Sequence, residues 1–132
     1  MGNRAVVQFE DGTGIYLHWN GGPESVLAFL DAAKKLGVRT NEDYGVARLV
    51  QIIGNWFGGT LSLGVGDALR LDRNNGDNGT YIIDGDFNIA SRNYTKSSIT
   101  TVDQLDQADR EKYQQIPDEV VAVNEPIFNK GS

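Results

Sequence analysis

The stretch Arg4–Trp19, RAVVQFEDGTGIYLHW, decides the fold of this chain of 132 residues. Two runs rich in β-branched and aromatic residues, Arg4–Phe9 and Ile15–Trp19, stand on either side of the turn sequence Asp11-Gly12-Thr13-Gly14. Short apolar runs bounded by glycine and aspartate are typical of strands that pair through a tight turn. We therefore expect a β-hairpin near the N-terminus.

Two amphipathic helices are predicted to follow the hairpin. Ser25–Leu36 carries apolar residues at helical spacing, and the next residue, Gly37, suits a helix C-terminus. A second helix is predicted from about Glu42 to Phe57, ended by Gly58-Gly59. The apolar residues that we expect to face the core are Val26, Phe29, Leu30, Ala33 and Leu36 in the first helix and Val46, Leu49, Val50, Ile53 and Phe57 in the second.

Short strands are predicted beyond the second helix. The polar run Asp72–Gly79 favours a hairpin loop between two of them. A third, polar helix is predicted at about Val102–Ile116, with Pro117 as its end. This order of elements indicates a small α+β domain, with an antiparallel sheet of about five to six strands and two to three helices packed mainly on one face. The strands predicted in this region are Thr60–Val65, Leu69–Leu71, Thr80–Ile83 and Phe87–Ala90.

The C-terminal segment is predicted to lie apart from the rest. Residues 1–117 form the expected single domain, and residues 118–132 form a tail that is either disordered or docked, on its own subunit or on a neighbouring one. Within this tail the β-branched run Val120–Val123 suits addition to an open sheet edge. For this reason we expect the chain to form a homo-oligomer.

The charge balance restricts the partners of the chain. It has 12 Lys and Arg residues against 18 Asp and Glu residues, a formal net charge of −6. Binding of phosphates requires clustered positive charge, so direct contact with nucleic acid is not expected, whereas a basic protein partner is compatible with the charge. The absence of cysteine excludes disulfides and thiolate metal sites. Without a secretory signal or an apolar run of about 20 residues, we expect a cytoplasmic protein with no membrane contact.

The run Asp72–Gly79 has some features of a calcium loop but not the complete pattern. Such a loop needs oxygen ligands at positions 1, 3 and 5, glycine at position 6 and glutamate at position 12. Counted from Asp72, these last three positions hold Gly76, Asp77 and Ile83. We therefore predict a turn and no dedicated metal site, and no cofactor. A weaker oxygen-ligand site made by Asp72, Asn74 and Asp77 is the alternative.

Catalytic residues are not assigned by the sequence. His18 is the only histidine, and it falls in a predicted strand. General acid–base chemistry needs an orienting carboxylate beside the ring, which sequence alone does not locate. A small hydrolase or nuclease that uses His18 with aspartates is therefore the alternative to a non-enzymatic binding protein.

The turn that leads into the first helix is one candidate ligand site. Trp19 precedes Asn20, Gly21 and Gly22, and backbone N–H groups at a helix start attract anions. The ring of Trp19 can stack on a base or another flat ring. The structural alternative is a strand-to-helix connection with Trp19 in the core.

A polar stripe on the second predicted helix is the other candidate site. Tyr44, Arg48, Gln51 and Asn55 recur at helical spacing on one face. Tyrosine and arginine are enriched in recognition surfaces, and arginine can bind a phosphate or carboxylate through two hydrogen bonds. The structural alternative is a solvated helix face.

Three segments resemble a family of small uncharacterised proteins encoded by bacteriophages and other mobile elements of bacteria. They are Gly14–Pro23, Tyr44–Leu49 and Asn55–Gly59, and the resemblance covers roughly residues 3–94. It implies an inhibitor of host defence that works in the host cytosol. Such an inhibitor sequesters a small nucleotide signal or blocks a defence effector protein such as a CRISPR nuclease. An interaction protein without a small ligand is a further alternative.

Overall fold

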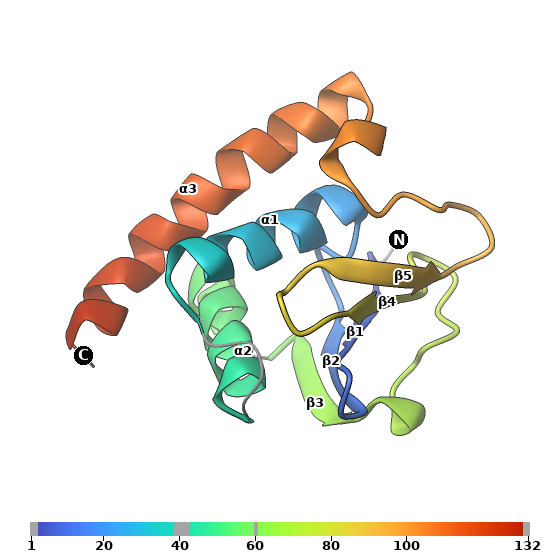
Figure 1. Ribbon diagram of the computed structural model, residues 1–132, viewed down its shortest axis with the longest axis horizontal. Helices are drawn as coiled ribbons and strands as arrows, with labels where there is room; N and C mark the ends of the chain where they lie inside the picture. The colour runs from blue at the N-terminus through green and yellow to red at the C-terminus, as the bar shows by residue number, and fades with distance from the viewer. Residues whose placement is uncertain (1–2, 39–42, 60, 131–132) are drawn as a thin grey trace.

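The computed structural model describes residues 3–38, 43–59 and 61–130, without the side chains of residues 43, 44 and 127–130. It has a five-stranded mixed sheet and three helices, which is the α+β class that the sequence predicts (Figure 1). The strands are β1 (Ala5–Gln8), β2 (Thr13–Leu17), β3 (Leu63–Asp67), β4 (Thr80–Ile83) and β5 (Ile89–Asn93). The helices are α1 (Pro23–Lys35), α2 (Asp43–Phe57) and α3 (Gln107–Lys130), with short 3-10 turns η1 (Ala68–Arg70) and η2 (Val102–Gln104).

The strand order across the sheet is β3-β2-β1-β4-β5. Three of the four neighbouring pairs are antiparallel, but β1 and β4 run parallel, so the sheet is not purely antiparallel as predicted. Strand β1 lies in the centre of the sheet. It pairs antiparallel with β2 on one side and parallel with β4 on the other. Strands β3 and β5 form the two edges.

The hairpin predicted from Arg4–Trp19 is confirmed as β1 and β2. Its turn lies closer to the N-terminus than predicted, because Thr13 and Gly14 belong to β2 and Gly14 pairs with Gln8. The backbone N–H of Phe9 donates to the carbonyl of Thr13 at 2.8 Å, and Gly12 adopts a φ of +90°. A residue with a side chain rarely takes this conformation, so Gly12 is required for the turn.

The first two helices pack as their apolar stripes predict. In α1 the residues Val26, Phe29 and Leu30 are buried, and Gly37 follows the helix in the left-handed conformation, with a φ of +73°. In α2, Leu49 and Ile53 are buried, together with Ile52, which lies outside the predicted stripe. The predicted start of this helix, Glu42, lies outside the described residues.

Helix α3 corrects three predictions, the first of which is its start, because it begins at Gln107 and not at about Val102. It continues through Pro117, which was expected to end it, and it includes the segment Val120–Val123, for which disorder or addition to a sheet edge was expected. Ile116 and Val120 are buried in the core shared with α1 and α2, and this burial offsets the cost of about 3 kcal/mol of a proline inside a helix. The structure thus packs Val120, Val121 and Asn124 of this segment against their own chain, and self-association remains a prediction.

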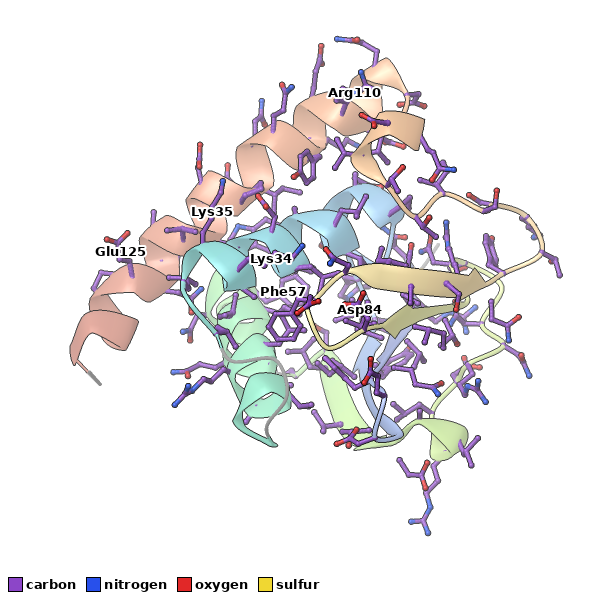
Figure 2. The ribbon with its side chains drawn as sticks, viewed as in Figure 1. Lys34, Lys35, Phe57, Asp84, Arg110 and Glu125 are labelled. Carbon is purple, nitrogen blue, oxygen red and sulfur yellow. The ribbon has the colours of Figure 1, made fainter. Side chains whose placement is uncertain are left out.

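Polar contacts also join α3 to its neighbours. Lys35 lies at the C-terminal end of α1 (Figure 2). Its Nζ is 3.4 Å from Asp31 Oδ2 and 4.0 Å from Asp118 Oδ1 of α3. The buried Asn124 donates from Nδ2 to the carbonyls of Ile52 and Val120. Among the described residues, no helix is long and apolar enough to cross a membrane.

The segment 72–79 is not a hairpin loop, because the predicted strand before it is the 3-10 turn η1. Asp67 Oδ1 accepts a hydrogen bond from the backbone N–H of Leu69, which favours this turn over extended chain. The segment therefore links η1 to β4. Its centre is the buried Asn75, whose Oδ1 accepts from the backbone N–H groups of Asn78 and Gly79, both at 3.0 Å.

Arg4 ties this segment to the start of β1. Its Nε lies 2.9 Å from Asp77 Oδ2, and its Nη1 lies 3.2 Å from Asp72 Oδ2. The hydrogen bonds from the side chain and backbone of Arg4 lower the pKa of Asp77. Two of the three residues of the alternative cation site, Asp72 and Asp77, are thus bound to a guanidinium group.

This pairing predicts a dependence of stability on pH. Because the pKa of Asp77 is lower in the folded chain than in the unfolded chain, its carboxylate stabilises the fold above the unfolded value of about 3.9. This stabilisation is lost as the pH falls toward the folded pKa. We expect the melting temperature of the wild-type chain to fall more steeply between about pH 5 and 3 than that of Asp77→Asn. The exposed Asp86, changed to asparagine, is the control, and equal slopes in wild type and Asp77→Asn would contradict the prediction.

Candidate binding cleft

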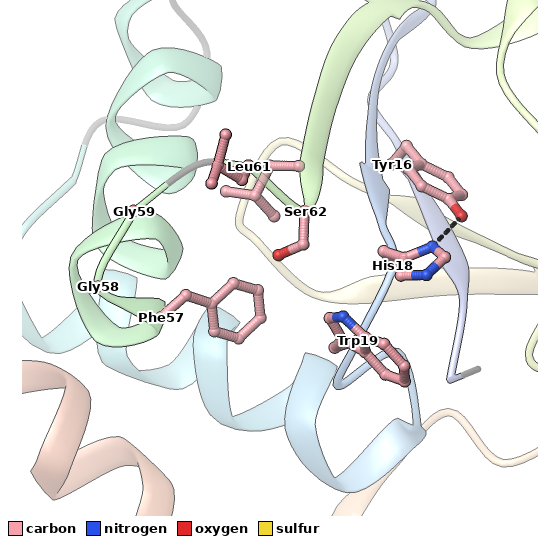
Figure 3. A pocket seen from close by; sticks show the side chains of 9 residues that line it. Tyr16, His18, Trp19, Phe57, Gly58, Gly59, Leu61 and Ser62 are labelled. Atoms are coloured by element: carbon pink, nitrogen blue, oxygen red, sulfur yellow. Dashed lines mark hydrogen bonds between the residues drawn. The ribbon is translucent and has the colours of Figure 1, made fainter. Parts of the chain in front are cut away.

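An open cleft of about 660 Å³ lies where the end of β2, the end of α2 and the start of β3 meet (Figure 3). Its walls come from two segments that are about 40 residues apart in the sequence. Most of the side chains that line it are aromatic or aliphatic, which is the usual composition of a binding pocket. The lining residues are Tyr16, His18, Trp19, Phe57, Gly58, Gly59, Leu61, Ser62 and Leu63.

One wall of the cleft is a row of rings on β2 and the turn after it. The Tyr16 hydroxyl lies 2.9 Å from His18 Nδ1, and the centroid of the His18 ring lies 4.8 Å from that of Trp19, edge to face. Trp19 is 47% exposed, so its ring is available for contact. Burial raises the pKa of Tyr16, which keeps its hydroxyl protonated. The ring of His18 is therefore held by a tyrosine, and no carboxylate bonds to it among the described residues.

The opposite wall is anchored in the core. The ring of Phe57 lies with its centroid 6.1 Å from that of the buried Phe29 and 5.6 Å from that of Trp56. After Phe57 the chain leaves α2 through Gly58 and Gly59, whose φ angles are +83° and +157°. These glycines turn the chain out of α2 and contribute no side chain to the lining of the cleft.

The turn Asn20-Gly21-Gly22 is used by the fold itself. The backbone N–H of Gly21 donates to the Asn3 carbonyl at 2.8 Å, and a Cβ on Gly21 would lie 2.6 Å from that oxygen. Gly22 is buried, and a Cβ on it would lie 2.6 Å from Oε2 of the Glu24 carboxylate. Burial raises the pKa of Glu24. A carboxylate of the chain thus lies beside the predicted anion site at this helix start.

The described side chains of the polar stripe on α2 do not line the cleft. Arg48 and Gln51 are exposed, whereas Asn55 donates from Nδ2 to Asn124 Oδ1 of α3 at 2.7 Å. The side chain of Tyr44 lies outside the described residues. Of the predicted ligand-binding residues that the structure describes, only Trp19 lines the cleft.

The other cleft residues were not proposed as ligand-binding from the sequence. His18 was considered only for catalysis, and Phe57 was assigned to the core. One local signal could have indicated Phe57 as a cleft residue, namely the aromatic pair Trp56-Phe57 directly before Gly58-Gly59. Two glycines after a helix have no side chains to cover a neighbouring ring. No family model, curated protein or solved structure matches this chain.

Proposed function

We propose that this chain is a non-enzymatic binding protein that neutralises a component of a bacterial host's defence, and that it binds this component through the aromatic cleft. The observation that carries the proposal is the cleft itself, with the half-exposed Trp19 facing a wall anchored by Phe57. The context of host defence comes from the resemblance to proteins of bacteriophages and mobile elements. In that context the protein works in the host cytosol.

A basic protein is the favoured partner. Among the described residues that line the cleft, none is lysine or arginine, so a phosphate group would find no opposite charge there. An apolar or aromatic side chain of a protein needs no such charge and fits between the rings. The net charge of −6 further favours a partner with a basic surface, because opposite charges speed association. A defence effector such as a CRISPR nuclease, which has a basic groove for nucleic acid, meets both conditions.

A small nucleotide signal is the second candidate. Trp19 supports it, because an exposed indole ring can stack on a base. The hydrolase alternative has less support, because the described partner of His18 Nδ1 is the Tyr16 hydroxyl and not a carboxylate that would orient the ring for acid–base chemistry.

Relief of a host defence tests the function directly. The chain is expressed in bacteria that carry either a CRISPR nuclease or a defence that signals through a cyclic nucleotide, and phage plating is counted. We expect plating to rise with the CRISPR nuclease and Trp19→Ala to abolish the rise. Val123→Ala is the matched control, since Val123 is exposed to a similar degree, 44%, and belongs to α3. A rise only with the nucleotide defence would select the second candidate. No rise with either, or full activity of Trp19→Ala, would contradict the proposal.

Fluorescence then separates the two ligand classes in vitro. The chain has two tryptophans, so in the Trp56→Phe variant all tryptophan emission comes from Trp19. We expect purified effector protein to shift this emission and a panel of cyclic nucleotides to leave it unchanged. The melting temperature of each variant without ligand verifies that the variant is folded. A rise in melting temperature on addition of a ligand gives a second measure of binding, because a tightly bound ligand stabilises the folded chain.

A further inference from the structure

The edge strand β3 presents unpaired main-chain groups. In an antiparallel pair, alternate residues point their N–H and C=O groups toward the neighbouring strand and away from it. The N–H of His18 donates to the Ser62 carbonyl, and the N–H of Ala68 donates to the Gly12 carbonyl, so these residues of the even-numbered set face β2. Leu63, Val65 and Asp67 therefore direct their main-chain groups to the open edge.

Exposed apolar side chains gather along the same strand. Leu61 is fully exposed, Val65 is 54% exposed, and Leu69, just beyond the strand, is 76% exposed. The two glycines of the strand, Gly64 and Gly66, present no side chain on the opposite face of the sheet, which leaves the edge easy to approach. Such an edge is a template for pairing with another strand unless something covers it.

An apolar hollow lies beside this edge. It has a volume of about 490 Å³ and lies between Val65 and the side chains of Val46 and Val50 on α2. Because side chains alternate along a strand, a strand added to β3 would place every second side chain on the helix-covered face, next to this hollow. The hollow thus gives an added strand a place for an apolar residue.

The charge at one end of the edge selects the occupant. Asp11 and Asp67 line a common hollow there, and both are exposed. Neither aspartate takes part in the ion pairs that Arg4 and Lys35 form. A second copy of the chain fits poorly, because antiparallel pairing centred on Val65 would set each Asp67 against an apolar Leu63. A basic residue at the end of an apolar strand complements the edge.

We propose that β3 binds, by strand addition, an extended segment of a partner protein in which apolar residues alternate and a lysine or arginine stands beside Asp11 and Asp67. Main-chain hydrogen bonds to Leu63, Val65 and Asp67 hold the segment, and the hollow beneath α2 takes an apolar side chain. This proposal deepens the proposed function. It rests on that function only for the identity of the partner protein that supplies the segment. The edge itself is tested without that partner.

The probe is a labelled peptide of alternating valine and threonine with arginine at both ends, so that either strand direction brings an arginine to Asp67. Its binding to the full chain is measured by fluorescence anisotropy. We expect Val65→Pro to weaken binding about tenfold or more, because it removes an outward N–H and leaves the bonds to β2 intact. Val123→Ala, at an exposed position on α3, is the control. Asp67→Asn is expected to weaken binding severalfold and to reduce its dependence on salt.

Three outcomes would overturn the proposal. They are failure of the wild-type chain to bind the peptide at millimolar concentration, equal binding by Val65→Pro, and equal binding of a peptide with glutamate in place of both arginines. Light scattering could also show a dimer of the wild-type chain that becomes a monomer in Val65→Pro. A second copy would then cover the edge, and this outcome also overturns the proposal. Because Trp19→Ala disables the cleft and leaves β3 unchanged, it is expected to bind the peptide normally. The proposed function and the role of the edge therefore fail separately.

Discussion

Replacing Phe29 with alanine is expected to lower the free energy of unfolding by about 3–5 kcal/mol. Phe29 is 1% exposed and lies at the centre of the contact between α1 and α2. Its ring packs edge to face on Trp56 and Phe57, with centroids 5.5 and 6.1 Å away. Truncation leaves a cavity that these rings cannot fill without moving, and the cost follows from both the lost burial and the cavity.

Denaturant unfolding measures this loss. Leu69→Ala is the control, because Leu69 is 76% exposed and its truncation is expected to change the free energy by no more than about 0.5 kcal/mol. Since Phe57 also forms a wall of the cleft, Phe29→Ala should in addition weaken binding by the folded protein. A loss below about 1 kcal/mol would mean that the core between α1 and α2 is not packed as the structure has it.

Replacing Arg92 with alanine is expected to cost about 2–4 kcal/mol, an unusually large effect for a charged residue. The Arg92 Cζ atom lies 4.6 Å from the centroid of the Tyr81 ring and 4.9 Å from that of Tyr94. Its guanidinium group donates to the carbonyls of Asn78 and Ile99. Arg92 thus fastens β5, the end of the 72–79 segment and the chain beyond β5 to one another.

Two variants separate the geometry of Arg92 from its charge. Arg92→Lys keeps the charge but not the planar fork of donors, so we expect it to recover less than half of the lost stability. Arg70→Ala removes an exposed arginine of η1 and should change the free energy by about 0.5 kcal/mol or less. Thermal and denaturant unfolding provide both values. Full recovery by lysine would show that charge alone accounts for the effect.

The sequence predicted the elements that depend on neighbouring residues. The hairpin of β1 and β2 follows from a turn that only glycine readily makes, at Gly12, and from apolar runs on both sides of it. The helices α1 and α2 follow from apolar residues at helical spacing and from Gly37 and Gly58 after their ends. Their buried faces were predictable because the apolar stripe of an amphipathic helix is buried against the core and its polar face remains in solvent.

The candidate site was predicted only through Trp19. The cleft needs the residues from Tyr16 to Trp19 to lie opposite Phe57 and Leu61–Leu63, and nothing in either set specifies the other. The polar stripe on α2 was misleading in part, because Asn55 bonds to Asn124 of a helix that was expected to have ended earlier. A polar residue at an interface between helices and one on a solvated face have the same pattern in sequence.

The sequence by itself determined the α+β class, the N-terminal hairpin and the inward faces of α1 and α2, because these follow from backbone preferences and from the period of apolar residues along a few turns. Only the tertiary structure decided the parallel pairing of β1 with β4, the passage of α3 through Pro117 and the joining of Trp19 to Phe57 in one cleft. Each of these depends on burial shared between segments far apart in the chain. Burial of Ile116 and Val120 outweighs the local preference of a proline, and such a balance is set by the whole fold.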